Sequence, residues 1–238
     1  MTQDELEKLI QNYQPNAKVL ESIKGIRLVA TVAPTASGKT VVARKLVDTS
    51  SDVHFVLGQT SRVPRAGEQN GVDYVFRTRD EIIGDMQKGL LVDVIVGPNG
   101  DLYSTNLEGY NLAGINIMAL VPPALLKYRQ LPLKLFRAGF IVPATYQQWR
   151  SWLESHAKNS GWGQAQIQER LAEARRSYEF ALSDNDIKFV LNDQIEKAAN
   201  RLRQVAENLS PDDEAMAKSI AQENLWLLTK DLGRNSVN

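Results

Sequence analysis

A short glycine-containing loop between an apolar run and an amphipathic run is the feature that most restricts how this chain can fold. The apolar run, "IRLVATVA" at residues 26–33, is rich in β-branched residues and predicts a buried strand. The loop "PTASGKT" follows, and "TVVARKLVDT" then has the apolar spacing of a helix. A strand that leads through a tight loop into a helix is typical of an α/β fold with a largely parallel sheet.

The same alternation continues along the chain. Helical spacing and short apolar runs follow one another to the C-terminal region, which favours one α/β architecture throughout. The turn sequence "GPNG" separates two of the strands, and Thr2 or Asp4 is available to cap the first helix. Strands are predicted at 53–58, 91–96, 101–105, 114–121, 135–143 and 187–191, and helices at 4–13, 79–90, 145–157, 165–182 and 194–209.

Composition excludes several classes of function. The 238 residues include 28 Lys and Arg and 28 Asp and Glu, so no net charge draws the chain to nucleic acid or to an anionic membrane. Cysteine is absent, which excludes disulfides and thiolate metal sites, and two histidines give no indication of a metal centre. No apolar run approaches the ~20 residues of a membrane helix, and the N-terminus lacks a secretory pattern. We therefore expect a cytoplasmic protein.

The loop at residues 33–40 matches the phosphate-loop pattern G-x-x-x-x-G-K-[ST], with alanine at the first position. Its backbone N–H groups and the helix N-terminus would receive phosphate oxygens. Gly38 would let the backbone approach closely, Lys39 would neutralise the β- and γ-phosphates, and Thr40 would offer its hydroxyl to Mg²⁺. The strand before and the helix after disfavour the alternative, a turn that only caps a helix. The predicted nucleotide-binding residues are Ala33, Pro34, Thr35, Ala36, Ser37, Gly38, Lys39 and Thr40.

A second motif, "TSRVPRAGEQNGVDYVF" at residues 60–76, crowds charged and small residues into a run that builds no core. It resembles the T-T-R-x-P-R-x-G-E-x-x-G-x-D-Y-x-F segment of the guanylate kinase family almost position by position. A match of this length argues against the alternative, a solvated charged turn. The resemblance extends from about Ile26 to Leu202.

The resemblance implies an α/β fold of the P-loop NTPase type, with a parallel core sheet, a small mixed β subdomain that binds GMP, and a helical lid. We expect this domain at residues 26–204, with the substrate-binding arm at about 58–112 and the lid at about 146–176. Residues 1–25 and 205–238 have no counterpart in the family pattern, and we predict them as N- and C-terminal helical extensions.

The resemblance also implies ATP-dependent phosphorylation of a nucleoside monophosphate, GMP being converted to GDP. Arg62 and Arg65 would grip the phosphate of the substrate, because guanidinium forks match phosphate geometry. Glu68 would hold these arginines, and Tyr74 would donate its hydroxyl to the same phosphate. The catalytic residues implied are Lys39, Arg62, Arg65 and Arg170, the last being the arginine of the lid pattern "ERLAEA".

The resemblance also implies which residues contact guanine of the substrate and adenine of ATP. Asp93 would replace the glutamate that accepts hydrogen bonds from guanine N1–H and the N2 amino group, and Thr105 would lie near the guanine oxygen. Tyr103 would contact the substrate phosphate, and Asn192 would contact adenine. The substrate-binding residues implied are Arg62, Arg65, Glu68, Tyr74, Asp93, Tyr103, Thr105 and Asn116.

Several positions of the family pattern are changed. The phosphate-binding serine falls at Gly58, and the D-I-D pattern aligns with residues 114–116, where Asn116 keeps hydrogen-bonding capacity without charge. A lid arginine falls at His156, and a lid glutamate falls at Ser177. Loss of one electrostatic stabiliser typically costs on the order of 100- to 1000-fold in rate. The sequence therefore leaves open a slow kinase, a kinase for another monophosphate, or a binding module.

Two alternatives to an active kinase remain. A catalytically weak nucleotide- or protein-binding module would keep the fold, although such modules usually degrade the phosphate loop, and Lys39 and Thr40 are intact here. The loop "PTASGKT" also resembles that of tRNA dimethylallyltransferases, but that family would not need the motif at residues 60–76. The expected partners are ATP with Mg²⁺ and a nucleoside monophosphate, without nucleic acid or membrane, and the expected state is a monomer or homodimer.

Overall fold

The computed structural model describes residues 3–65, 67–97 and 100–235 of the chain. The predicted cap Thr2 and the two central residues of the predicted "GPNG" turn lie outside these ranges. The chain divides into two compact units. Unit 1 comprises residues 1–28, 54–116 and 123–136, and unit 2 comprises residues 29–53, 117–122 and 137–238.

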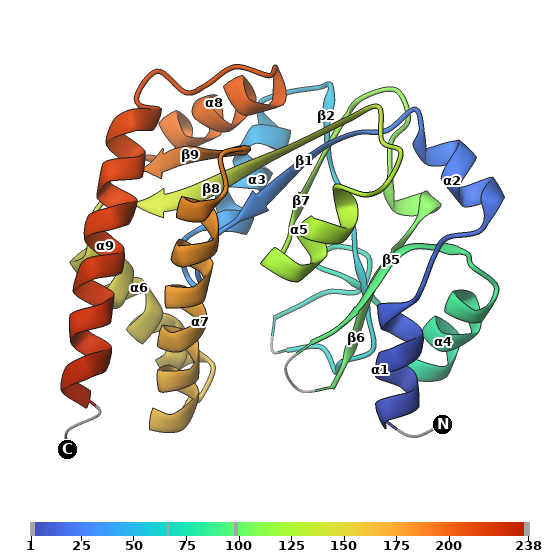
Figure 1. Cartoon of the computed structure of the whole chain (residues 1–238), viewed down its shortest axis with the longest axis horizontal. Helices are drawn as coiled ribbons and strands as arrows, with labels where there is room; N and C mark the ends of the chain where they lie inside the picture. The colour runs from blue at the N-terminus through green and yellow to red at the C-terminus, as the bar shows by residue number, and fades with distance from the viewer. Residues whose placement is uncertain (1–2, 66, 98–99, 236–238) are drawn as a thin grey trace. The chain divides into compact units, whose positions relative to one another are not determined.

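A five-stranded parallel sheet forms the core of the fold, as the sequence predicted (Figure 1). The strand order is β2-β7-β1-β8-β9, so the strand that leads into the phosphate loop is central. Pairing of β8 with β9 is parallel, from Ala138 opposite Ile187 to Pro143 opposite Asn192. Five of the six residues of β1 are buried, which explains its continuous β-branched run. The strands are β1 (Arg27–Val32), β2 (Val53–Phe55), β7 (Ile115–Ala119), β8 (Leu135–Pro143) and β9 (Ile187–Asn192).

Five helices complete the described part of unit 2. Helix α3 packs against α8, and α9 packs along α7 and against β9 (Figure 1). Helix α9 buries Ala217, Ala221 and Leu228, and the Nδ2 of Asn224 donates to the carbonyl of Pro143 at 3.1 Å. The C-terminal helix therefore packs on unit 2 through one buried face. The helices are α3 (Lys39–Asp48), α6 (Tyr146–Asn159), α7 (Gln164–Ser183), α8 (Ile195–Ala206) and α9 (Glu214–Asn235).

Unit 1 contains a small mixed sheet with the strand order β4-β3-β6-β5. Strands β3 and β4 pair in parallel, whereas β6 pairs antiparallel with both β3 and β5. A short 3₁₀ helix, η1 (Leu107–Gly109), follows β6. The strands are β3 (Gln59–Thr60), β4 (Val75–Phe76), β5 (Leu91–Val96) and β6 (Leu102–Asn106).

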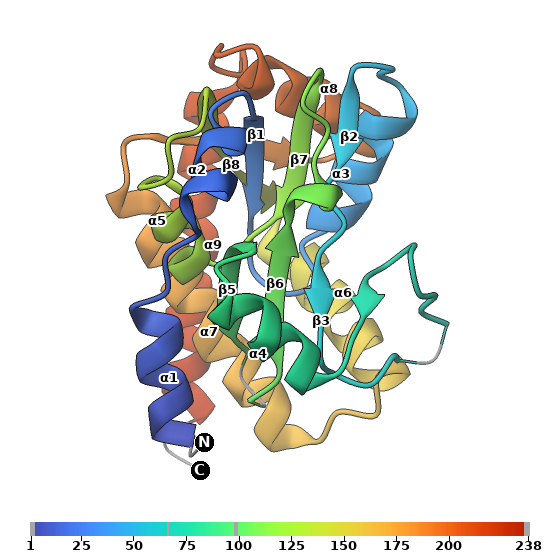
Figure 2. The same cartoon turned by 90° about the vertical axis from the view of Figure 1, so that its right-hand side faces the viewer.

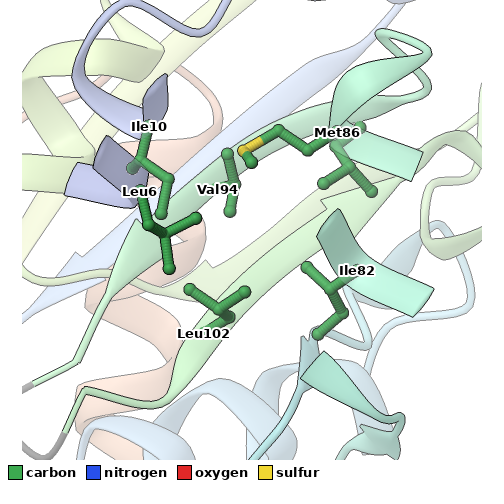
Figure 3. Close-up of a cluster of buried hydrophobic side chains, with 7 residues drawn as sticks. Leu6, Ile10, Ile82, Met86, Val94 and Leu102 are labelled. Atoms are coloured by element: carbon green, nitrogen blue, oxygen red, sulfur yellow. The ribbon is translucent and has the colours of Figure 1, made fainter. Parts of the chain in front are cut away.

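The first helix of the chain packs against β5 of this small sheet (Figure 2). Helix α1 (Gln3–Gln11) and α4 (Arg79–Gln87) cover β5 and β6 with a cluster of apolar side chains (Figure 3). The hydroxyl of Tyr13 donates to the carbonyl of Leu91 at 2.6 Å and accepts from its N–H at 3.0 Å. The N-terminal helix therefore packs on unit 1 through the face that carries Leu6 and Ile10. The cluster consists of Leu6, Ile10, Ile82, Met86, Leu91, Val94 and Leu102.

Two helices were not identified as separate elements by the sequence patterns. Helix α2 (Ala17–Ile23) begins after Asn16, whose side chain accepts from the N–H of Val19. Helix α5 (Pro122–Tyr128) begins with two prolines. Proline is favoured in the first turn of a helix, because the N–H groups there have no intrahelical partner. The predicted strand at 53–58 also ends early, at Phe55.

Candidate active site

The phosphate loop joins β1 to α3 in unit 2 through two residues with left-handed backbone conformations. Ala36 has φ 63° and Gly38 has φ 86°. A Cβ atom on Gly38 would lie 2.7 Å from the Nδ2 of Asn192, so glycine is required both by conformation and by space. The same Nδ2 donates to the carbonyl of Ser37 at 3.0 Å. Asn192, at the end of β9, therefore braces the loop through the backbone, whereas the sequence suggested an adenine contact.

Lys39 begins helix α3 and turns back over the loop. Its Nζ donates to the carbonyl of Ala33 at 2.9 Å. Burial lowers the pKa of Lys39, the charge of Glu173 opposes this change, and the charge of Arg170 adds to it. Thr40 lies in the first turn of α3 and is exposed. An ammonium and an accessible hydroxyl thus stand at the N-terminus of a helix, where anions are stabilised.

Two further observations fit a loop that binds phosphate. The hydroxyl of Ser37 is buried and has no hydrogen-bond partner among the described residues. A buried hydroxyl left unsatisfied costs free energy, so a phosphate oxygen or a water molecule at this point would satisfy it. The indole Nε1 of Trp149, on α6, donates to the carbonyl of Thr35 at 2.9 Å and fixes the loop from another side.

A clamp of charged and aromatic side chains forms in unit 1 from residues of the second motif. The guanidinium of Arg62 donates to both carboxylate oxygens of Glu68, each at 2.6 Å. Its Cζ lies 5.1 Å from the ring centroid of Tyr74, and the rings of Tyr74 and Tyr103 meet edge to face at 6.0 Å. The hydrogen bond to Glu68 raises the pKa of Arg62, and contact with Tyr103 contributes. Three residues that the resemblance assigned to the substrate phosphate, namely Arg62, Tyr74 and Tyr103, therefore lie together with Glu68, which it assigned to holding the arginines.

Arg65 has a different place from Arg62. Its backbone N–H donates to Glu68 Oε2 at 2.8 Å, and its side chain is exposed. Glu68 therefore organises the motif by binding one arginine through its side chain and the other through its backbone. The hydrogen bonds that Arg62 donates to Glu68 lower the pKa of this carboxylate, so it is ionised at neutral pH.

Asp93 and Thr105 lie opposite each other on β5 and β6, and Thr105 is two residues along β6 from Tyr103 of the clamp. Thr105 takes part in a closed set of three hydroxyl contacts, at 3.0 Å to Tyr110, 2.8 Å to Tyr128, and 2.6 Å between the two tyrosines. Burial raises the pKa of Asp93 to about 6, an effect that Lys127 opposes. The sequence patterns did not identify Tyr110 or Tyr128, because no local signal connects them to Thr105.

Asn116 does not lie where the sequence alignment suggested. It is the second residue of β7 and is fully buried, whereas ligands of parallel α/β sheets bind beyond the carboxyl ends of the strands. Its Oδ1 accepts from the N–H of Asn111, and its Nδ2 donates to the carbonyls of Arg27 and Asn111. The amide is therefore saturated by backbone contacts, and we leave Asn116 out of the proposed site. The carboxyl end of β7, at Ala119 and Leu120, carries no acidic residue.

Arg170, the predicted lid arginine, lies on α7 in unit 2. Its Nη1 donates to Glu173 Oε2 at 2.5 Å, and its Cζ lies 5.5 Å from the ring centroid of Trp162. Glu173 also lies within 3.5 Å of the hydroxyl of Thr35 in the phosphate loop. No sequence motif assigns a role to Glu173, although its spacing of three residues from Arg170 is that of an ion pair on a helix.

Within residues 3–65, 67–97 and 100–235, no three His, Asp or Glu side chains gather in a way that could hold a metal ion. In the same ranges, no helix has both the length and the apolar character needed to cross a bilayer.

The fold and the loop define a phosphate-loop protein of the α/β class, and comparisons with known proteins give its family. The guanylate kinase family model matches residues 25–209. A guanylate kinase of Schizosaccharomyces pombe is 27% identical over 76% of this chain and 90% of its own length, and one of Geobacter metallireducens is 28% identical over 73% and 84%. The crystal structure of guanylate kinase from Anaplasma phagocytophilum superposes with a TM-score of 0.56 at 19% identity, covering 77% of this chain and 85% of that one.

The chain therefore belongs to the guanylate kinase family. Membership makes it a phosphotransferase of the nucleoside monophosphate kinase class, which uses ATP as donor.

Proposed function

We propose that this protein transfers the γ-phosphoryl group of ATP to GMP, forming ADP and GDP. The observation that carries the proposal is the clamp in unit 1, where Glu68 holds the guanidinium of Arg62 beside Tyr74 and Tyr103. A rigid, charged group with nearby phenol hydroxyls suits the phosphate of a nucleoside monophosphate. The names of the relatives favour GMP as this substrate.

The phosphate loop is the proposed site for the phosphates of ATP. Backbone N–H groups of the loop and the buried hydroxyl of Ser37 would contact phosphate oxygens, and Lys39 would neutralise their charge. Asn192 and Trp149 support this role indirectly, because both bind backbone carbonyls of the loop. We assign them to positioning of the loop.

Asp93 is the residue that we assign to recognition of the guanine base of GMP. Its carboxylate, when ionised, can accept hydrogen bonds from the adjacent donors of guanine, N1–H and the N2 amino group. Adenine offers an acceptor at N1, which would face the carboxylate unfavourably. Thr105 lies on the same face of the small sheet and would position this end of the site.

Mg²⁺ fits the loop in the limited sense that Thr40 presents an exposed hydroxyl at the first turn of α3. This ion binds through few protein ligands, together with phosphate oxygens and water, so the residues present are compatible with it. When bound, Mg²⁺ would supply positive charge that neutralises the phosphates of ATP. No carboxylate at the end of β7 contributes, because Ala119 and Leu120 stand there.

The reaction needs no nucleophilic side chain. An oxygen of the GMP phosphate attacks the γ-phosphorus of ATP, the bond from that phosphorus to the β–γ bridging oxygen breaks, and ADP leaves. The protein contributes position and charge: Arg62 orients the attacking phosphate, and Lys39 and Arg170 offset the charge on the transferred group.

A coupled assay of ADP formation tests the proposal. The purified protein, ATP and Mg²⁺ are combined with GMP, AMP, CMP or UMP, and kcat/KM is compared among the four. We expect GMP to be turned over with the highest kcat/KM. Lys39→Ala should reduce kcat by about 100- to 1000-fold. The control is Lys45→Ala, which removes another lysine of α3, one that pairs with Glu196 on α8, and it should change kcat little. GMP binding without turnover of any monophosphate would instead indicate a binding module.

A further inference from the structure

Glu173 lies beside the phosphate loop, although the lid pattern "ERLAEA" that contains it gives no role to this position. It lies on α7, one helical turn after Arg170, and its Oε2 accepts from Arg170 at 2.5 Å. Both of its carboxylate oxygens lie 3.5 Å from the hydroxyl of Thr35, from which it is separated by 138 residues of sequence. Trp149 fixes the backbone of Thr35. The carboxylate is therefore held against a constrained part of the loop.

The charge of Glu173 acts on the two cations that the reaction would use. Arg170 is in direct contact with it. Lys39 also experiences its charge, since Glu173 opposes the lowering of the Lys39 pKa that burial and Arg170 produce. One carboxylate thus balances an ammonium and a guanidinium at the site where the phosphates of ATP would lie.

We propose that Glu173 is an internal counter-ion of the phosphate loop, which competes with the terminal phosphates of ATP and ADP for Lys39 and Arg170 and so lowers nucleotide affinity. This inference rests on the proposed function, because it takes ATP as the ligand of the loop. Glu173 acts as a positioning residue, and it is not a member of the catalytic set.

The physical reason is the repulsion between like charges. Phosphate oxygens bound at Lys39 would stand close to the carboxylate, and in a partly buried site this repulsion is large compared with thermal energy. Nucleotide binding therefore requires Arg170 to exchange its carboxylate partner for phosphate, or requires Glu173 to move away from Thr35. The same competition favours departure of ADP after transfer.

The substitution Glu173→Gln tests this inference, because glutamine keeps the shape and an acceptor for Arg170 while removing the charge. Dissociation constants of ATP and ADP are measured by titration calorimetry without GMP, and GMP is titrated separately. We expect E173Q to bind ATP and ADP about five- to ten-fold more tightly than wild type, with unchanged GMP affinity. The gain should shrink as ionic strength rises.

Two variants serve as controls. Glu179→Gln removes another glutamate of α7, which pairs with Arg175 at 2.7 Å on an exposed surface, and it should leave ATP affinity unchanged. Glu173→Asp keeps the charge and should bind ATP much as wild type does. Thermal unfolding of each variant verifies that the fold is retained.

Weaker ATP binding by E173Q would show that Glu173 helps to hold nucleotide or Mg²⁺, and it would overturn the inference. An unchanged affinity would overturn it equally. The proposed function fails on a different measurement, namely when the wild-type protein itself does not bind ATP or does not phosphorylate GMP.

Discussion

Asp93 lies directly opposite Thr105 across the antiparallel strands β5 and β6, so both side chains project from one face of the small sheet. Both residues are buried, with exposed fractions of 8% for Asp93 and 3% for Thr105. Burial raises the pKa of Asp93 to about 6, and the charge of Lys127 limits the rise. On the proposed assignment of Asp93 to guanine, a carboxyl with this pKa would make GMP binding sensitive to pH near 6.

The first prediction concerns the pH dependence of GMP binding. Ionised Asp93 accepts from two guanine donors, whereas the protonated form offers a donor of its own, so GMP affinity should fall as pH decreases through about 6. Asp93→Asn should weaken GMP binding by about 10- to 100-fold at pH 8. The phosphate of GMP titrates near the same pH, so D93N serves as the control for that contribution. Equal pH profiles for the two proteins would contradict the assignment.

The second prediction concerns stability. The carboxyl pKa of Asp93 rises from 3.8 to about 6 in the folded protein. Between these values the folded state binds a proton that the unfolded state has released, so the free energy of unfolding decreases as pH rises through the window. Asp93→Asn removes this decrease. The free energy of unfolding of the variant, relative to that of wild type, should therefore increase by on the order of 3 kcal/mol from pH 4 to pH 7. Chemical denaturation at several pH values measures the difference. A difference in the free energy of unfolding between D93N and wild type that does not change with pH would mean that the pKa of Asp93 is not raised.

The third prediction concerns the clamp. Glu68→Gln keeps hydrogen bonding to Arg62 but removes the charge that fixes the guanidinium, so KM for GMP should rise about ten-fold while KM for ATP stays constant. The matched control is Asp85→Asn, because Asp85 pairs with Arg77 at 2.6 Å elsewhere in unit 1. A similar rise of KM in both variants would indicate a general loss of order in unit 1.

Much of the fold and part of the site could be predicted from local sequence. The loop from Ala33 to Thr40 could be found because its residues are contiguous and its flanks show clear periodicity. Glu173 could not be connected to Thr35 in this way, since the contact spans 138 residues. Local pattern also misled at Asn116, where a short match to an aspartate motif ignored the position of the residue near the start of β7. Contacts that depend on packing between distant elements need the folded chain.

The fourth prediction separates two roles of Asn192. The sequence suggested contact with adenine, whereas in the fold the Nδ2 donates to the carbonyl of Ser37 and fills the space beside Gly38. Asn192→Ala should therefore raise KM for ATP and for GTP as donors by the same factor, about five- to ten-fold, because the loop is loosened for both. Steady-state rates with each donor at saturating GMP give the two factors. A rise for ATP alone would restore the adenine contact.

The fifth prediction concerns the N-terminal helix, which the family pattern does not include. Leu6 is 2% exposed and packs with Ile82 and Leu102 on the small sheet (Figure 3). Leu6→Ala should lower the free energy of unfolding by about 2–5 kcal/mol, because it removes buried methyl groups and leaves a cavity. The matched control is Leu9→Ala, since Leu9 lies on the same helix with 39% of its surface exposed, and it should cost less than about 1 kcal/mol. Urea denaturation of the two variants measures the difference, and equal costs would show that α1 does not pack on β5 and β6 in solution.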